Sequence, residues 1–95
     1  SLDLEHQLLL AQLYYFKGDA EEAEKIIQRT KNAQPEDYKM MNKIGFFYLN
    51  SLFRVKEALD CFEKSLSLSH AQPEILSLST RLKNDYLNKL TAVWK

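Results

Sequence analysis

A pattern of large and small apolar residues recurs along this 95-residue chain at a separation close to 34 residues. The matched positions are Leu10 and Ile44, Ala11 and Gly45, and Tyr14 and Tyr48 at 34 residues, then Ala23 and Ala58, Ile27 and Phe62, Thr30 and Ser65, and Pro35 and Pro73 at slightly longer separations. Such a period is typical of proteins that stack copies of one supersecondary unit. The repeat therefore predicts a stacked architecture in which each unit buries its apolar face against the next.

Each unit contains two helical patterns, because apolar residues recur at spacings of three and four and nothing alternates with period two. The chain has only two glycines and two prolines, which also favours helices. Five helices are expected, at residues 3–17, 20–32, 36–50, 55–68 and 74–93. Gly18 suits the left-handed end of the first helix, and Asp19 with Glu22 forms a capping-box pattern for the second.

The two units resemble the tetratricopeptide repeat (TPR) family, whose 34-residue unit is a pair of antiparallel helices. The residues that carry the resemblance are Leu10, Ala11, Tyr14, Gly18, Ala23, Ile27, Thr30 and Pro35 in the first unit, and Met41, Ile44, Gly45, Tyr48, Ala58, Phe62, Ser65 and Pro73 in the second. Two positions depart from the family pattern: Gln7 stands where a Trp is usual, and Lys83 where a small residue is usual.

The resemblance implies an all-α, tetratricopeptide-type α-solenoid forming one domain over residues 1–95. Repeat one would span about 4–37, repeat two about 38–75, and a C-terminal capping helix about 74–93, giving five antiparallel helices. Small residues such as Ala11 and Gly45 would let paired helices approach closely, while Tyr14 and Tyr48 would fill the space between layers. Because Ser1 is not a Met, we expect a segment of a longer protein.

In the resembled family, the first helix of each pair lines a concave groove that binds partner proteins. Transferred position by position, the groove residues are Gln12, Tyr15, Phe16, Lys39, Asn42, Lys43, Phe46, Asn50, Arg81, Asn84 and Asn88. Amide side chains suit the backbone of an extended peptide, the cations suit an acidic partner, and the aromatic rings suit anchoring contacts. The alternative interpretation is that these are ordinary solvated residues beside core aromatics.

Other function classes find little support in the sequence. The two histidines lie in different units without a spaced set of metal ligands, and Cys61 falls beside core residues, so no catalytic residue, metal or cofactor is expected and the chain is predicted not to be an enzyme. A net charge of zero argues against nucleic acid, and the apolar runs are too short to span a membrane. A single cysteine fits a cytoplasmic, intracellular location.

The sequence thus predicts a protein–protein interaction module that forms part of a scaffold or adaptor. One alternative is self-association (homo-oligomerisation) through the fifth helix, since residues 1–37 carry 4 Lys/Arg and 8 Asp/Glu while residues 38–95 carry 9 and 5. Another is a helical regulatory or substrate-binding domain attached to an enzyme. Binding of chaperone C-terminal tails is disfavoured, because only Arg81 matches the Lys/Asn/Arg clamp of family members with that activity.

Overall fold

The computed structural model describes residues 3–33 and 35–92, and within these ranges the fold consists of five α-helices without a strand. The helices are α1 (Leu4–Phe16), α2 (Ala20–Asn32), α3 (Tyr38–Asn50), α4 (Val55–Leu68) and α5 (Pro73–Ala92). The all-helical prediction is confirmed, and four helices begin within one residue of the expected position. The exception is α3, which begins two residues late because Asp37 caps it by accepting a hydrogen bond from the Lys39 backbone N–H at 2.9 Å.

The first two helices begin and end as their sequence signals predict. The Asp3 carboxylate accepts from the His6 N–H at 2.9 Å, and the Asp19 carboxylate accepts from the Glu22 N–H at 3.1 Å. Gly18 has a φ of +90°, the left-handed conformation in which glycine escapes the steric cost of a Cβ. These contacts explain why so short a connection folds α1 and α2 into an antiparallel hairpin.

The connection between α3 and α4 is longer and uses a different residue for its left-handed position. Phe53 has a φ of +56° and its side chain is 77% exposed. A bulky residue rarely adopts this conformation, because its Cβ crowds the following carbonyl oxygen. The turn nevertheless closes a second antiparallel hairpin.

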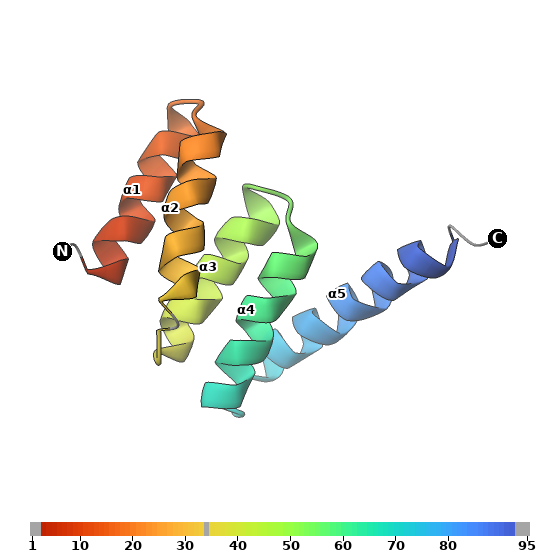
Figure 1. The fold of residues 1–95 in the computed structure, drawn as a ribbon. Coiled ribbons are helices and arrows are strands. Elements are labelled where there is room, and N and C mark those ends of the chain that lie inside the picture. Colours follow the sequence, from red (N-terminus) through yellow and green to blue (C-terminus); the bar gives the residue numbers. More distant parts are fainter. Residues whose placement is uncertain (1–2, 34, 93–95) are drawn as a thin grey trace.

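The two hairpins stand side by side and bury a shared core (Figure 1). In this arrangement α1 and α3 line one face of the molecule, and α2 and α4 line the opposite face. The fully buried side chains come from both hairpins and include Ala11, Ala23, Ile27, Ile44, Ala58, Cys61 and Phe62. The fold is therefore repeat-like, with the same two-helix unit occurring twice.

The small residues of the repeat do mark close approaches between helices. Ala11, Ala23 and Ala58 are completely buried. A Cβ added to Gly45 would lie 2.7 Å from Cε1 of Phe62, so the ring of α4 occupies the space that a side chain on α3 would need. Tyr48 is buried as expected, but Tyr14 is only half-buried.

The fifth helix departs from the expected set of five antiparallel helices. Its first turns contact the core through the partly buried Ile75, Leu78 and Leu82. Beyond Leu82 the helix runs obliquely away from α4, and its C-terminal end stands clear of the body (Figure 1). The predicted end at Val93 lies outside the described residues. None of the described helices combines the length and hydrophobicity needed to cross a bilayer.

A polar network at the α4–α5 turn sets the direction in which α5 leaves. The Gln72 amide nitrogen donates to the Ser65 hydroxyl at 3.0 Å and to the Ser69 carbonyl at 2.9 Å. The Gln72 carbonyl oxygen accepts from the Asn42 amide nitrogen of α3 at 2.7 Å. The Gln72 side chain thus ties the turn to α3 and α4, while the buried Asn42 Oδ1 finds no hydrogen-bond partner among the described residues.

Candidate partner-binding groove

A groove with a volume of about 520 Å³ runs between α1 and α3. Six of the eleven predicted groove residues line it: Gln12, Tyr15, Phe16, Lys43, Phe46 and Asn50. The rest of its lining consists of Glu5, Leu8, Leu9, Phe47 and Ser51. Most of this lining is apolar, which is the usual composition of a surface that buries part of a ligand.

The helical period explains why these residues share one surface. On α1 the lining residues follow each other at spacings of three and four, and the same holds on α3. The 34-residue repeat places equivalent positions opposite one another, so Gln12 corresponds to Phe46 and Phe16 corresponds to Asn50. The positions transferred from the resembled family therefore include this half of the groove lining.

Aromatic rings give the groove its shape. The Tyr15 ring meets Phe47 edge-on with centroids 6.0 Å apart, and Phe46 meets the buried Phe62 edge-on at 5.1 Å. Phe16 contacts Tyr15 at 6.3 Å but remains 85% exposed. Edge-to-face contacts hold such rings in defined positions, so the groove presents supported aromatic surface rather than loose side chains.

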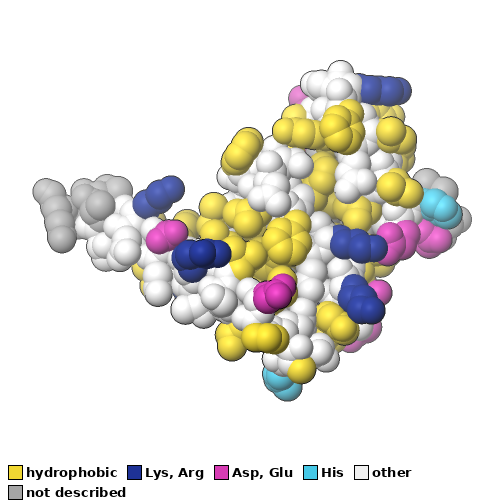
Figure 2. All heavy atoms as spheres, turned by 180° about the vertical axis from the view of Figure 1, so that it is seen from behind, with side chains coloured by type: hydrophobic (Ala, Val, Ile, Leu, Met, Phe, Trp, Pro, Cys, Tyr) yellow, Lys and Arg dark blue, Asp and Glu magenta, His cyan; other side chains and the backbone are white. Residues whose placement is uncertain are grey.

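Several apolar side chains on this surface have no cover in the described chain. Leu9 is 55% exposed, and Phe46 is 38% exposed although its ring packs against the core. Figure 2 shows hydrophobic side chains gathered over the middle of the molecule when it is seen from behind. Contiguous exposed apolar surface of this kind usually marks an interaction site.

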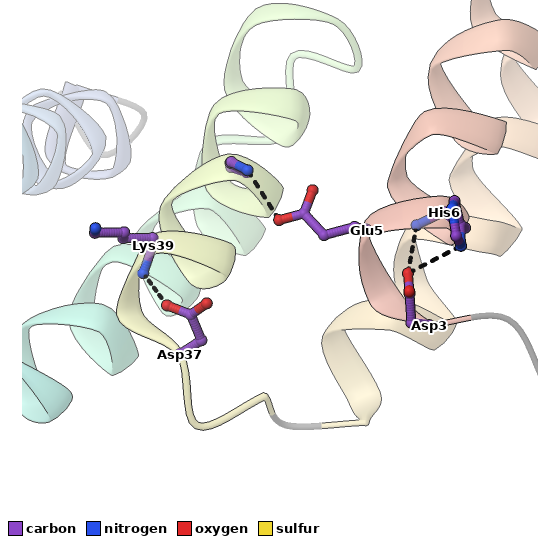
Figure 3. Close-up of polar contacts among 6 residues, drawn as sticks. Asp3, Glu5, His6, Asp37 and Lys39 are labelled. Carbon is purple, nitrogen blue, oxygen red and sulfur yellow. Dashed lines mark hydrogen bonds and ion pairs between the residues drawn. The ribbon is translucent and has the colours of Figure 1, made fainter.

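An ion pair closes one end of the groove. The Glu5 carboxylate reaches from α1 to α3 and accepts from the Lys43 ammonium at 2.9 Å, as Figure 3 shows for the Glu5 side. Both side chains are about half exposed. An acidic partner would therefore have to compete with Glu5 for the Lys43 ammonium. No sequence signal paired these two residues, since the contact depends on the packing of the hairpins.

The other five predicted residues do not line this groove. Asn42 is half-buried and its amide nitrogen donates to Gln72 in the turn network. The Lys39 ammonium lies 6.0 Å from the ring centroid of its neighbour Tyr38. The remaining three, Arg81, Asn84 and Asn88, are exposed on α5. The predicted continuous groove over α1, α3 and α5 is thus built only between α1 and α3.

The opposite face is polar and its charges compensate one another. Glu24 pairs with Arg54 at 2.7 Å, and Lys31 pairs with Asp60 at 3.3 Å. The Lys31 ammonium also lies 5.7 Å from the centroid of the Tyr48 ring. A surface whose ions are already paired and whose lining is mainly polar is a weaker candidate for partner binding than the apolar groove.

Chemically reactive groups are sparse among the described residues. Burial raises the pKa of the Cys61 thiol to about 12, so the sulfur stays protonated and poorly nucleophilic. Burial likewise raises the pKa of Tyr48 to about 12. Within residues 3–33 and 35–92, His, Cys, Asp and Glu form no cluster of three that could hold a metal ion.

No protein-family model, curated protein or solved structure matches the chain at a significant level. The resemblance to tetratricopeptide repeats therefore rests on the residues of this chain alone.

Proposed function

We propose that this chain is a TPR-like protein–protein interaction module, a segment of a scaffold or adaptor, and that the α1–α3 groove binds a segment of a partner protein. The observation that carries the proposal is the exposed apolar lining of that groove. Leu9, Phe16 and Phe46 come from both hairpins and lie on one surface, where they would lose contact with water when a partner binds.

The chemistry of the lining indicates which partner segment fits. Tyr15 and Phe46 offer ring faces to an aliphatic or aromatic anchor residue, and Gln12 and Asn50 offer amide donors and acceptors to its backbone. Because Lys43 is already neutralised by Glu5 within the chain, the groove favours an apolar anchor over a carboxylate. This refines the sequence-based expectation of an acidic partner.

A matched pair of aromatic variants tests the proposal. Phe16→Asp places a charge in the groove, while Phe53→Asp makes the same change at an equally exposed ring in the α3–α4 turn. Peptides selected from an extended-peptide library should bind Phe16→Asp about tenfold or more weakly than the unchanged protein. Binding to Phe53→Asp should be unchanged. Equal affinity of both variants would refute the groove as the binding site.

A second substitution tests the inferred preference for apolar anchors. Glu5→Gln removes the carboxylate that neutralises Lys43 and leaves the shape of the groove nearly unchanged. We expect the variant to gain affinity for acidic peptides from the same library, with a dependence on salt that the unchanged protein lacks. If acidic peptides bind both proteins equally, Glu5 does not control the selectivity of the groove.

A further inference from the structure

We propose that Phe62, a core residue of α4, positions the Phe46 ring of the α1–α3 groove and thereby raises the affinity of the groove for its partner. Gly45 permits this arrangement, because its missing side chain leaves room for the Phe62 ring against α3. The inference rests on the proposed function and extends it, since it assigns a role in binding to a residue that does not line the groove.

A direct edge-on contact between two rings links the core to the groove. The ring centroids of Phe46 and Phe62 are 5.1 Å apart, and the ring planes are inclined by 65°. Phe62 is completely buried, whereas Phe46 is 38% exposed and lines the groove. The contact therefore joins a side chain that the core holds in place to one whose outer surface is available to a partner.

The glycine at position 45 lets the Phe62 ring reach this place. A Cβ on Gly45 would lie 2.7 Å from Cε1 of the ring and 3.0 Å from its Cδ1 and Cζ. The ring thus occupies the space directly beside the α3 backbone, one residue away from Phe46. Although α4 lines the opposite face of the molecule, one of its side chains supports the groove wall through this gap.

The two repeats differ together at the three positions of this arrangement. The matched pairs are Ala11 and Gly45, Gln12 and Phe46, and Ile27 and Phe62. Where the groove residue is an amide, the small residue keeps its methyl group and the buried residue of the second helix is aliphatic. Where the groove residue is a ring, a glycine and a second ring support it. Because both repeats fold into the same hairpin, the hairpin itself does not require the two rings and the glycine.

Support of the ring affects affinity through the freedom of the Phe46 side chain. An exposed side chain samples several rotamers, and a partner that contacts it must first order it. Contact with a buried ring already favours one orientation in the free protein. The strength of an edge-to-face pair corresponds to roughly three- to tenfold in affinity, so removal of the Phe62 ring should weaken binding by about that factor.

The first test observes the Phe46 ring without a ligand. NMR relaxation of isotope-labelled phenylalanine rings measures their mobility, and the mobility of the Phe46 ring should rise in Phe62→Leu. It should rise as well in Gly45→Ala, which displaces the Phe62 ring and keeps both rings in the chain. Ile27→Val alters the equivalent buried position of the first repeat and should leave the Phe46 ring unchanged. Equal mobility of this ring in Phe62→Leu and the unchanged protein would overturn the proposal.

A second test separates support of the ring from stability of the core. The probes are the peptides selected with the unchanged protein, at a temperature where circular dichroism shows every variant to be folded. Phe62→Leu should bind them about three- to tenfold more weakly, and Ile27→Val should bind them normally. Combining Gly45→Ala with Phe62→Leu should restore stability, because leucine makes room for the new methyl group, but should leave binding weak. If affinity recovers together with stability, the proposal is wrong.

The decisive comparison is made in the Phe46→Leu background. Leucine keeps apolar contact with the peptide but has no ring for Phe62 to support. If Phe62 acts through Phe46, adding Phe62→Leu to this background should change affinity by less than about twofold. An equal loss of affinity in both backgrounds would mean that Phe62 affects binding by another route, and would overturn the inference.

The same variants distinguish this inference from the proposed function. If Phe16→Asp loses peptide binding but Phe62→Leu does not, the proposed function stands and the inference falls. If Phe16→Asp binds as well as the unchanged protein, the proposed function falls, and the mobility of the Phe46 ring then decides whether Phe62 positions it.

Discussion

Replacing Gly45 by alanine sets helix propensity against packing at the contact between α3 and α4. Alanine in a helix interior is more favourable than glycine by about 1 kcal/mol, so propensity alone predicts a more stable protein. The structure predicts the opposite, because the new Cβ would lie 2.7 Å from Phe62 Cε1 and 3.0 Å from two further ring atoms. Phe62 is fully buried, so its ring can move away from the new Cβ only by displacing the core residues packed around it.

The size of the effect follows from these two terms. Overpacking a tight core costs typically 1–3 kcal/mol, and the close contacts with a buried ring place Gly45→Ala at the upper end of that range. After the gain in propensity, we expect a net loss of about 1 to 2 kcal/mol in the free energy of unfolding. For a domain of this size the midpoint of thermal unfolding should fall by roughly 4 to 16 °C.

Circular dichroism during thermal and urea unfolding measures this change, and a double-mutant cycle assigns it. Phe62→Leu should destabilise the unchanged protein by leaving a cavity, but in the Gly45→Ala background it should cost much less because it makes room for the methyl group. Gly18→Ala is the matched control: it strains a left-handed turn, has nothing within 4 Å of the added Cβ, and should be additive with Phe62→Leu. A stabilised Gly45→Ala protein would refute the reasoning.

Two further predictions concern the α4–α5 turn and the buried thiol. Gln72→Ala removes the hydrogen bonds that join the turn to α3 and α4. Limited proteolysis should therefore cut α5 faster in this variant than in the unchanged protein, while α1–α4 remain resistant. Equal rates of cleavage of α5 in the two proteins would contradict this role of Gln72. Cys61 should react with thiol reagents only after unfolding. Because the folded thiol has a pKa of about 12 and its ordinary value is 9.0, the free energy of unfolding should fall as pH rises from about 9 to 12, and Cys61→Ala should flatten that slope.

The features of the fold that could be predicted from the sequence are those that depend on local residue spacing and on the register of the repeat. Spacings of three and four with Asp and Gly at the ends located the helices, and the resemblance to tetratricopeptide repeats assigned Phe16 and Asn50 to one groove. The Glu5–Lys43 ion pair escaped prediction because its partners meet only when the hairpins pack at one particular angle. Asn42 had the right register for the groove, but its amide was drawn into the α4–α5 turn.

The direction of α5 also lay beyond local reasoning. Its apolar spacing is helical from Ile75 to Leu90, which fixes the helix but not the point where it leaves the body. The residue at which α5 leaves the body depends on where α4 ends and on the hydrogen bonds that Gln72 makes in the α4–α5 turn. Predicted groove residues on α5, such as Arg81 and Asn84, consequently ended up away from the α1–α3 surface.

The distribution of ion pairs gives the stack unequal resistance to mechanical load. The junction between the hairpins is tied on both faces, by Glu5–Lys43 on one side and by Glu24–Arg54 and Lys31–Asp60 on the other. The described part of α5 is held by the core contacts of Ile75, Leu78 and Leu82, by the turn network at its base and by one ion pair, Lys83–Glu63. Under tension between the two ends of the chain, the turns of α5 beyond Leu82 should therefore detach from α4 at low force, because the core contacts of this helix end at that residue.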